Sequence, residues 1–136
     1  MSYSAPITEM AFTLEAVAGL GEAREAGIAA DLTPDDTVAI LSEAARFAEE
    51  VLAPLNTVGD HHHSRLVDGA VTTPPGWQDA YRQWVDGGWG SLPGPIEAGG
   101  PGLPMALQIA ATDLLNHATP AFAPHPLPPP RAAAAP

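Results

Sequence analysis

The residues of this 136-residue sequence that first suggest chemistry are three consecutive histidines, His61, His62 and His63. Zinc sites need ligands that converge on one point, commonly from positions i and i+4 of a helix or across a hairpin. Adjacent side chains in a loop point in divergent directions, and the sequence contains no cysteine that could complete such a site. We therefore expect no resident metal. The pattern favours an exposed loop, and adventitious affinity for nickel or zinc is the alternative.

A second candidate for chemistry is the glycine-rich segment Ala98-Gly99-Gly100-Pro101-Gly102, which could be mistaken for a phosphate-binding loop. A dinucleotide-binding fingerprint requires a strand before its glycines, and a P-loop ends in Gly-Lys-Ser/Thr. The sequence contains no lysine at all. We therefore expect this segment to turn the chain between two helices and to bind no nucleotide.

No arrangement of nucleophiles or acids along the chain indicates a catalytic site. Serine, histidine and aspartate all occur, but no Gly-x-Ser-x-Gly segment would place a serine on a strained turn. Two acidic pairs, at residues 35–36 and 49–50, occupy predicted helix starts or solvent faces, where carboxylates cap or solubilise a helix. The residues by themselves therefore identify no catalytic and no cofactor-binding side chain.

The composition is that of an acidic globular chain. Sixteen acidic residues oppose five basic ones, all of them arginine, and the formal net charge is -11. Nucleic acids and anionic membranes are bound through basic patches, so neither is an expected partner. The hydrophobic content of 46% is typical of a folded domain. The absence of cysteine fits a reducing compartment.

The sequence also bears on the compartment. The first ten residues, MSYSAPITEM, contain neither the basic segment nor the apolar segment of a secretory signal. No apolar run approaches the roughly 18 residues that a membrane span requires. We therefore expect a cytoplasmic protein without a membrane-spanning segment.

Apolar residues at helical spacing predict four helices, which cover about residues 7–20, 33–53, 73–86 and 105–117. The second has Thr33 before its first turn and Pro34 at its first position, and Pro54 is expected to end or kink it. The fourth helix is apolar on nearly every side, which predicts a buried central helix.

The connections between these helices are of different kinds. Residues 22–30 are interpreted as a loop or a short helix, and residues 65–72 as a small hairpin around Asp68-Gly69, a dipeptide that tolerates the required positive φ angles. Residues 89–104 are rich in glycine and proline and form a loop. Residues 124–136 contain six prolines in thirteen positions and are expected to be disordered. The fold class is therefore all-α, with a small hairpin and a Pro/Ala-rich tail.

Four aromatic residues, Trp77, Tyr81, Trp84 and Trp89, occur in and directly after the third predicted helix. We interpret them as aromatics of the core and its edge. The alternative is an interface with segments that this chain does not contain.

Several segments, in order along the chain, resemble one family. They are residues 47–56 (FAEEVLAPLN) with 58–60, residues 68–76 (DGAVTTPPG), Tyr81, residues 87–89 (GGW) and residues 99–104 (GGPGLP), preceded by residues 3–6 (YSAP) with Phe12 and Leu14. The resemblance covers residues 1 to about 123. These segments resemble the N-terminal helical domain of the acyl-CoA dehydrogenases, in particular the subgroup that includes the 3-methylmercaptopropionyl-CoA dehydrogenases.

The resemblance implies a family of FAD enzymes that oxidise acyl-CoA thioesters to 2,3-enoyl-CoA. In that family a glutamate of the C-terminal domain removes the α proton and the flavin accepts the hydride. Neither that glutamate nor the flavin-binding segments have a counterpart here, so no catalytic or FAD-binding residue is carried over. The family's N-terminal domain supplies helices beside the acyl chain. By position, the helix at residues 105–117 would form that wall of the pocket, with Ala111, Leu114 and Leu115 as candidates.

The resemblance also implies an organisation into three parts. Residues 1–32 form an N-terminal extension with one helix, residues 33–123 form the helical domain, and residues 124–136 form the tail. Where the family continues into another helix, this chain becomes proline and alanine, so we expect a frameshift or premature stop that leaves an inactive chain. The alternatives are a stand-alone helical interaction module and a split subunit that pairs with a flavin-binding chain. Apolar faces left uncovered predict self-association or pairing with a dehydrogenase chain.

Overall fold

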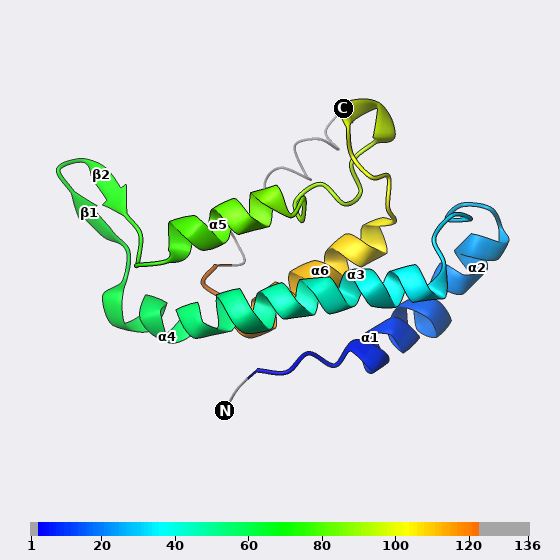
Figure 1. Ribbon diagram of the computed structural model, residues 1–136, viewed down its shortest axis with the longest axis horizontal. Coiled ribbons are helices and arrows are strands. Elements are labelled where there is room, and N and C mark those ends of the chain that lie inside the picture. The colour runs from blue at the N-terminus through cyan, green and yellow to red at the C-terminus, as the bar shows by residue number, and fades with distance from the viewer. Residues whose placement is uncertain (1–2, 123–136) are drawn as a thin grey trace.

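The computed structural model describes residues 3–122, and its fold is all-α with one small hairpin, which confirms the predicted fold class. The helical elements are α1 (Ile7–Phe12), η1 (Thr13–Val17), α2 (Leu20–Glu25), α3 (Pro34–Phe47), η2 (Ala48–Leu52), α4 (Ala53–His62), α5 (Trp77–Asp86), η3 (Ile96–Ala98) and α6 (Met105–Ala118) (Figure 1). Elements η1 and η2 are π-helical, and η3 is a single 3-10 turn. The predicted disordered tail, residues 124–136, lies outside the described residues.

The longest element is a continuous helical rod made of α3, η2 and α4 (Figure 1). It begins with a capping box, in which the backbone N–H of Asp36 donates to the Thr33 hydroxyl at 3.1 Å and the backbone N–H of Thr33 donates to the Asp36 carboxylate at 3.0 Å. These bonds satisfy two amides that a bare helix end would leave without partners. The predicted start of this helix is therefore confirmed.

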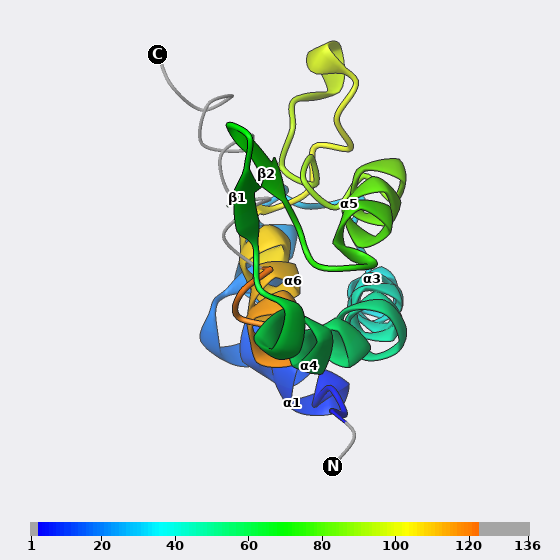
Figure 2. The same ribbon diagram turned by 90° about the vertical axis from the view of Figure 1, so that its left-hand side faces the viewer.

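The helix does not end at Pro54 but runs on to His62, and α4 turns away from the axis of α3 (Figure 2). Of the two expected outcomes at Pro54, an end or a kink, the kink is the one that occurs. Pro54 lies in the first turn of α4, where its missing N–H costs the helix one hydrogen bond. The preceding turn widens into the π-helical η2, in which the backbone N–H of Ala53 bonds to the carbonyl of Ala48. The backbone keeps right-handed helical angles at both junctions, so the helix passes the proline without ending.

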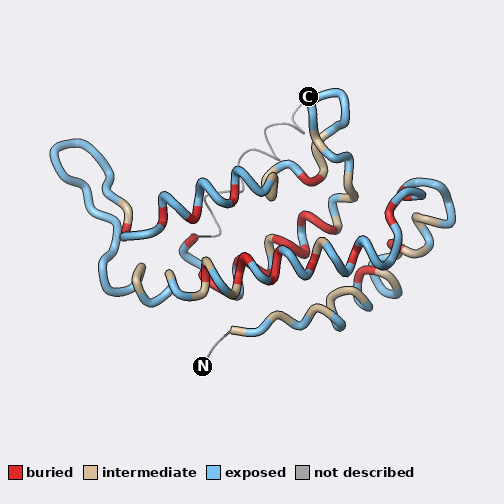
Figure 3. The backbone as a smooth tube through the Cα atoms, in the orientation of Figure 1, coloured by how far each residue is buried: buried red, intermediate tan, exposed pale blue. Residues whose placement is uncertain are grey.

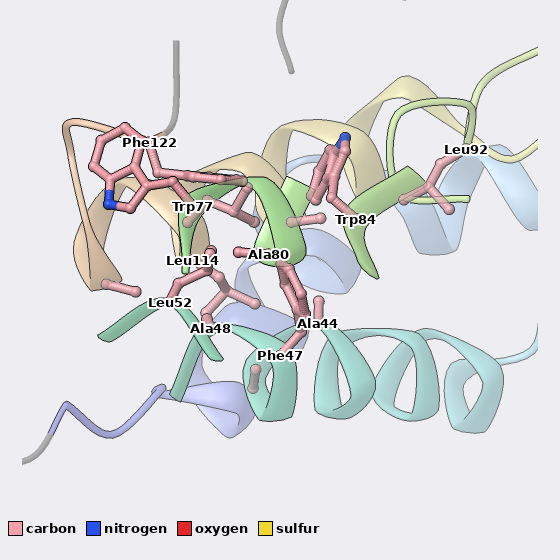
Figure 4. Close-up of a cluster of buried hydrophobic side chains, with 14 residues drawn as sticks. Ala44, Phe47, Ala48, Leu52, Trp77, Ala80, Trp84, Leu92, Leu114 and Phe122 are labelled. Atoms are coloured by element: carbon pink, nitrogen blue, oxygen red, sulfur yellow. The ribbon is translucent and has the colours of Figure 1, made fainter. Parts of the chain in front are cut away.

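Most of the core lies between the rod, α5 and α6, which surround a common interior when the molecule is viewed along its long axis (Figure 2). The buried positions of these helices face one another there (Figure 3). Aromatic rings fill this interior: Phe47 and Trp84 lie with ring centroids 6.3 Å apart, and Trp77 meets Phe122 edge-on at 5.9 Å (Figure 4). Trp77 and Trp84 are thus core aromatics, whereas Tyr81 is 43% exposed.

A second group of buried side chains joins the N-terminal elements to α3 and α6. It contains Leu14, Leu20, Ala29, Leu32, Leu41, Leu107 and Ala110. Residues 22–30, for which a loop or a short helix is expected, contain the end of the short helix α2 followed by turns. An ion pair between Glu15 and Arg24, at 2.7 Å, joins η1 to α2 at this end of the molecule.

The predicted hairpin consists of β1 (Arg65–Val67) and β2 (Ala70–Thr72), paired antiparallel with Leu66 opposite Val71. Its turn has positive φ at Asp68 (50°) and Gly69 (80°), as a two-residue hairpin turn requires. Both strands are exposed along their whole length, so the hairpin projects from the helical body (Figure 1).

The glycine-rich loop between α5 and α6 is held by its own backbone. The N–H of Leu103 donates to the carbonyl of Leu92 at 2.8 Å, and the N–H of Gly102 donates to the carbonyl of Gly94 at 2.9 Å. Gly94 and Gly100 approach so closely that a Cβ on Gly100 would overlap the Gly94 carbonyl. The loop therefore folds back on itself and turns the chain between two helices.

Candidate functional site

Helix α6 carries the three residues predicted to face an acyl chain, and the structure places all three inside the molecule. Ala111 is 0% exposed, and Leu114 and Leu115 are each 1% exposed. They belong to the core cluster that includes Leu52 of η2 and aromatic residues of α5 (Figure 4). These side chains therefore fix the position of α6, and the prediction that they line a pocket stays a prediction.

The opposite side of α6 is left uncovered. Ile109 is 64% exposed and Met105 is 48% exposed, although both are large apolar side chains. The expectation of a helix buried on every side is therefore wrong for this strip. Positions 105 and 109 lie one turn apart on one face, and no described element covers that face.

An open groove of about 460 Å³ lies beside this strip, between α6 and the α1–η1 segment. Its lining is mainly apolar and includes Met10, Leu14, Ala106, Ile109 and Ala110. Two carboxylates, Glu9 of α1 and Asp113 of α6, also line the groove. Sequence reasoning missed this groove because α1 and α6 are far apart in the chain and only their packing brings them together.

Helix α6 also carries polar groups on its buried side. Gln108 is 6% exposed, and its amide nitrogen lies 3.4 Å from the hydroxyl of Thr112, one turn further on. Within residues 3–122 the amide oxygen of Gln108 and the hydroxyl of the fully buried Thr119 have no hydrogen-bond partner. A glutamine in a run of apolar residues is the signal that could have drawn attention to these buried polar groups.

The N-terminal segment contributes one perturbed side chain near α6. Burial raises the pKa of the Tyr3 hydroxyl, and the carboxylates of Asp113 and Glu49 raise it further because they disfavour a phenolate. The same Glu49 accepts a hydrogen bond from the backbone N–H of Ala5 at 2.7 Å. Tyr3 is partly buried and packs against the core cluster.

The three histidines lie at the C-terminal end of α4, where the predicted loop is replaced by helix for two of them. His61 and His62 occupy the last turn of α4, and His63 leaves the helix with a φ of 49°. All three are exposed, and no group of three metal-ligating side chains is close enough to hold an ion within the described range. The prediction of a loop is therefore wrong for His61 and His62, because the helix continues past Pro54.

The glycine-rich loop offers no cradle for a phosphate in the part of the chain that is described. Its N–H groups at Gly100 and Gly102 donate to the carbonyls of Pro95 and Gly94, so they are already engaged. The side chains at the nearest turn, η3, include the acidic Glu97. The loop connects α5 to α6, and the prediction that it binds no nucleotide stays a prediction.

Among residues 3–122, no helix has the length and apolar character that would carry it across a membrane. No family model matches the sequence. The chain is 39% identical, over 122 residues, to the 3-methylmercaptopropionyl-CoA dehydrogenase of Ruegeria pomeroyi. The match covers 90% of this chain and 21% of that enzyme, so the chain spans about one fifth of the length of this relative. The resemblance inferred from the sequence blocks is thereby confirmed: the chain is a homologue of one segment of an acyl-CoA dehydrogenase.

Proposed function

We propose that this chain provides the helical segment of a flavin-dependent acyl-CoA dehydrogenase and is inactive by itself. The observation that carries the proposal is the 39% identity over nearly the whole chain to an acyl-CoA dehydrogenase of which it matches 21%. Such enzymes remove hydrogen from the α and β carbons of an acyl-CoA thioester. In this proposal α6 forms one wall of the acyl pocket, and the protein acts in the cytoplasm.

Within that wall, Ala111, Leu114 and Leu115 are the proposed pocket residues. Because these side chains are buried against the rod and α5, we propose that they set the distance between α6 and these helices. That distance fixes where the wall formed by α6 lies. We also propose the division into residues 1–32, 33–123 and 124–136. The first part packs on the second through Leu14 and Leu41, which share one buried cluster.

The described residues offer no cluster of unpaired cationic groups for the FAD that the family uses. A flavin dinucleotide carries a pyrophosphate, which needs free cationic groups or free N–H groups. Three of the four arginines among residues 3–122, Arg24, Arg46 and Arg82, pair with carboxylates, so Arg65 on the exposed hairpin is the one without an ion pair there. The N–H groups of Gly100 and Gly102 are engaged within their own loop. We therefore derive no reaction step through the flavin, and we expect this chain to bind none alone.

The test is purification of the chain followed by an absorbance spectrum and a dehydrogenation assay with acyl-CoA and an artificial electron acceptor. We expect no visible flavin band and no product, whereas the full-length relative assayed alongside gives both. A flavin band that co-purifies with this chain, or turnover by it, contradicts the proposal.

A second candidate function is a split subunit that pairs with a separate flavin-binding chain. The exposure of Ile109 and Met105 on α6 favours it, because an apolar strip of this kind is normally covered by another element. An adjacent reading frame that encodes flavin-binding and C-terminal domains, and that restores activity when expressed with this chain, would support this function.

A further inference from the structure

We propose that the groove between α1–η1 and α6 is a docking site for an amphipathic helix whose apolar face is flanked by lysine or arginine and which belongs to another polypeptide. This inference goes beyond the proposed function, because it requires neither flavin nor thioester. It rests on the shape, apolar lining and charge of one surface of this chain.

The floor of the groove is apolar and accessible. Leu14 and Ala110 form its buried base, and Met10 and Ala106 are half-buried beside them. Ile109 rises from α6 with 64% of its surface exposed. A helix that docks in such a groove inserts side chains spaced three and four positions apart, because these share one face.

The charge around the groove selects a cationic occupant. Glu9 and Asp113 line it from α1 and α6. Within the described residues neither pairs with an arginine: Glu9 has no ion pair, and Asp113 lies 3.5 Å from His117 only. Basic side chains that flank an apolar helix face would therefore meet two available carboxylates.

The same charges disfavour two other occupants of the groove, a second copy of this chain and an acyl-CoA molecule. A second copy of this chain brings a further formal charge of -11. An acyl-CoA molecule brings anionic phosphates close to the same carboxylates. The structure therefore favours a basic amphipathic helix over both.

The experiment measures binding of two synthetic helical peptides, one built from leucine and lysine and one from leucine and glutamate in the same apolar pattern. Binding is measured by titration calorimetry at an ionic strength of about 0.15 M, at which salt screens long-range attraction between the acidic protein and a basic peptide. We expect the leucine–lysine peptide to bind and the leucine–glutamate peptide not to bind. Equal binding of both peptides, or binding of neither, overturns the proposal.

A pair of apolar variants locates the site. Ile109→Ser removes an exposed apolar side chain inside the groove, and Val85→Ser removes one that is 56% exposed on α5, outside its lining. We expect Ile109→Ser to weaken binding of the leucine–lysine peptide by about tenfold, the effect of losing one buried aliphatic side chain. Val85→Ser should weaken it by less than about twofold. Equal losses of binding affinity in the two variants contradict the placement of the peptide in the groove.

A pair of charge variants separates the groove from the general acidity of the protein. Glu9→Gln with Asp113→Asn and the control Glu97→Gln with Asp60→Asn change the net charge by the same amount. We expect only the first pair of substitutions to weaken binding of the leucine–lysine peptide, by about fivefold or more. Equal weakening by both pairs, or binding of lauroyl-CoA to the wild-type groove in place of the peptide, overturns the proposal. Circular dichroism of each variant checks that its fold is retained.

Discussion

Two side chains on one helix show how strongly their surroundings determine their roles. Leu114 and Ile109 are both large and aliphatic, and both belong to α6. Leu114 is 1% exposed and packs in the core, whereas Ile109 is 64% exposed. Residue type alone therefore does not separate the packing positions of α6 from its free surface.

We expect Leu114→Ala to lower the free energy of unfolding by about 3 kcal/mol, because it leaves a cavity in a closely packed core. The matched variant Ile109→Ala should change it by less than about 0.5 kcal/mol. Urea unfolding followed by circular dichroism measures both. Similar losses in the two variants would contradict the burial of Leu114 and the exposure of Ile109.

The ion pair between Glu15 and Arg24 makes the stability of the fold depend on pH. Two nitrogens of Arg24 donate to the two carboxylate oxygens of Glu15, at 3.0 and 2.7 Å. These hydrogen bonds are the largest cause that holds the pKa of Glu15 below its usual value, and the charge of Arg24 and the Thr37 hydroxyl act in the same direction. A depressed folded-state pKa stabilises the fold above the ordinary glutamate pKa, about 4.3, and this contribution is lost as the pH falls through the folded-state value.

The variant Glu15→Gln should therefore lower the urea midpoint at pH 7 and reduce its decline between about pH 5 and pH 3. The control Glu22→Gln removes an exposed carboxylate of α2 that has no ion pair within the described residues. Urea midpoints across this pH range provide the measurement. A decline of unchanged steepness in Glu15→Gln would show that other carboxylates cause it.

At the scale of elements, the α5–α6 loop is determined by one close approach of backbone to backbone. The facing positions Gly94 and Gly100 leave no room for a side chain, and the hydrogen bonds from Gly102 and Leu103 depend on that approach. The loop leads directly into α6, which begins at Met105.

Gly100→Ala should destabilise the protein clearly more than Gly99→Ala. The first substitution introduces steric overlap with Gly94, and the second introduces backbone strain alone. Gly99 has a φ of 80° and open space around its Cβ position, so its substitution costs about 1 kcal/mol through conformation alone. Gly100→Ala must move the Gly94 backbone. Thermal unfolding of the two variants gives the comparison, and equal melting temperatures would refute the close contact.

At the scale of the whole molecule, an acidic surface coexists with exposed apolar strips. The formal net charge of -11 makes two copies repel each other, while Ile109 and Met105 offer apolar surface for association. Salt screens the first effect far more than the second.

We therefore expect self-association to increase with salt. Sedimentation velocity at about 10 mM sodium chloride, where the Debye length is about 30 Å, should show mainly monomer, and about 1 M salt should shift the distribution to larger species. Ile109→Ser should reduce this shift. Strongest association at low salt would instead indicate ion pairing between copies.

The sequence by itself determined the helices that have local signals. Thr33, Pro34 and Asp36 define a helix start within four residues, and Asp68-Gly69 defines a hairpin turn, because these interactions join near neighbours in the chain. The family relationship was also readable, because it is spread over ordered blocks and needs no three-dimensional information.

Only the tertiary structure decided which side of α6 is core. A helix with apolar residues on nearly every side contains no information about which neighbours cover it, and here the rod and α5 cover Leu114 while Ile109 stays open. The continuation of the rod past Pro54 to His62 was likewise not readable, because one proline can end a helix or be absorbed by a wider turn. The choice of the core side of α6 depends on packing between segments far apart in the chain, and so the groove between α1–η1 and α6 exists only in the folded molecule.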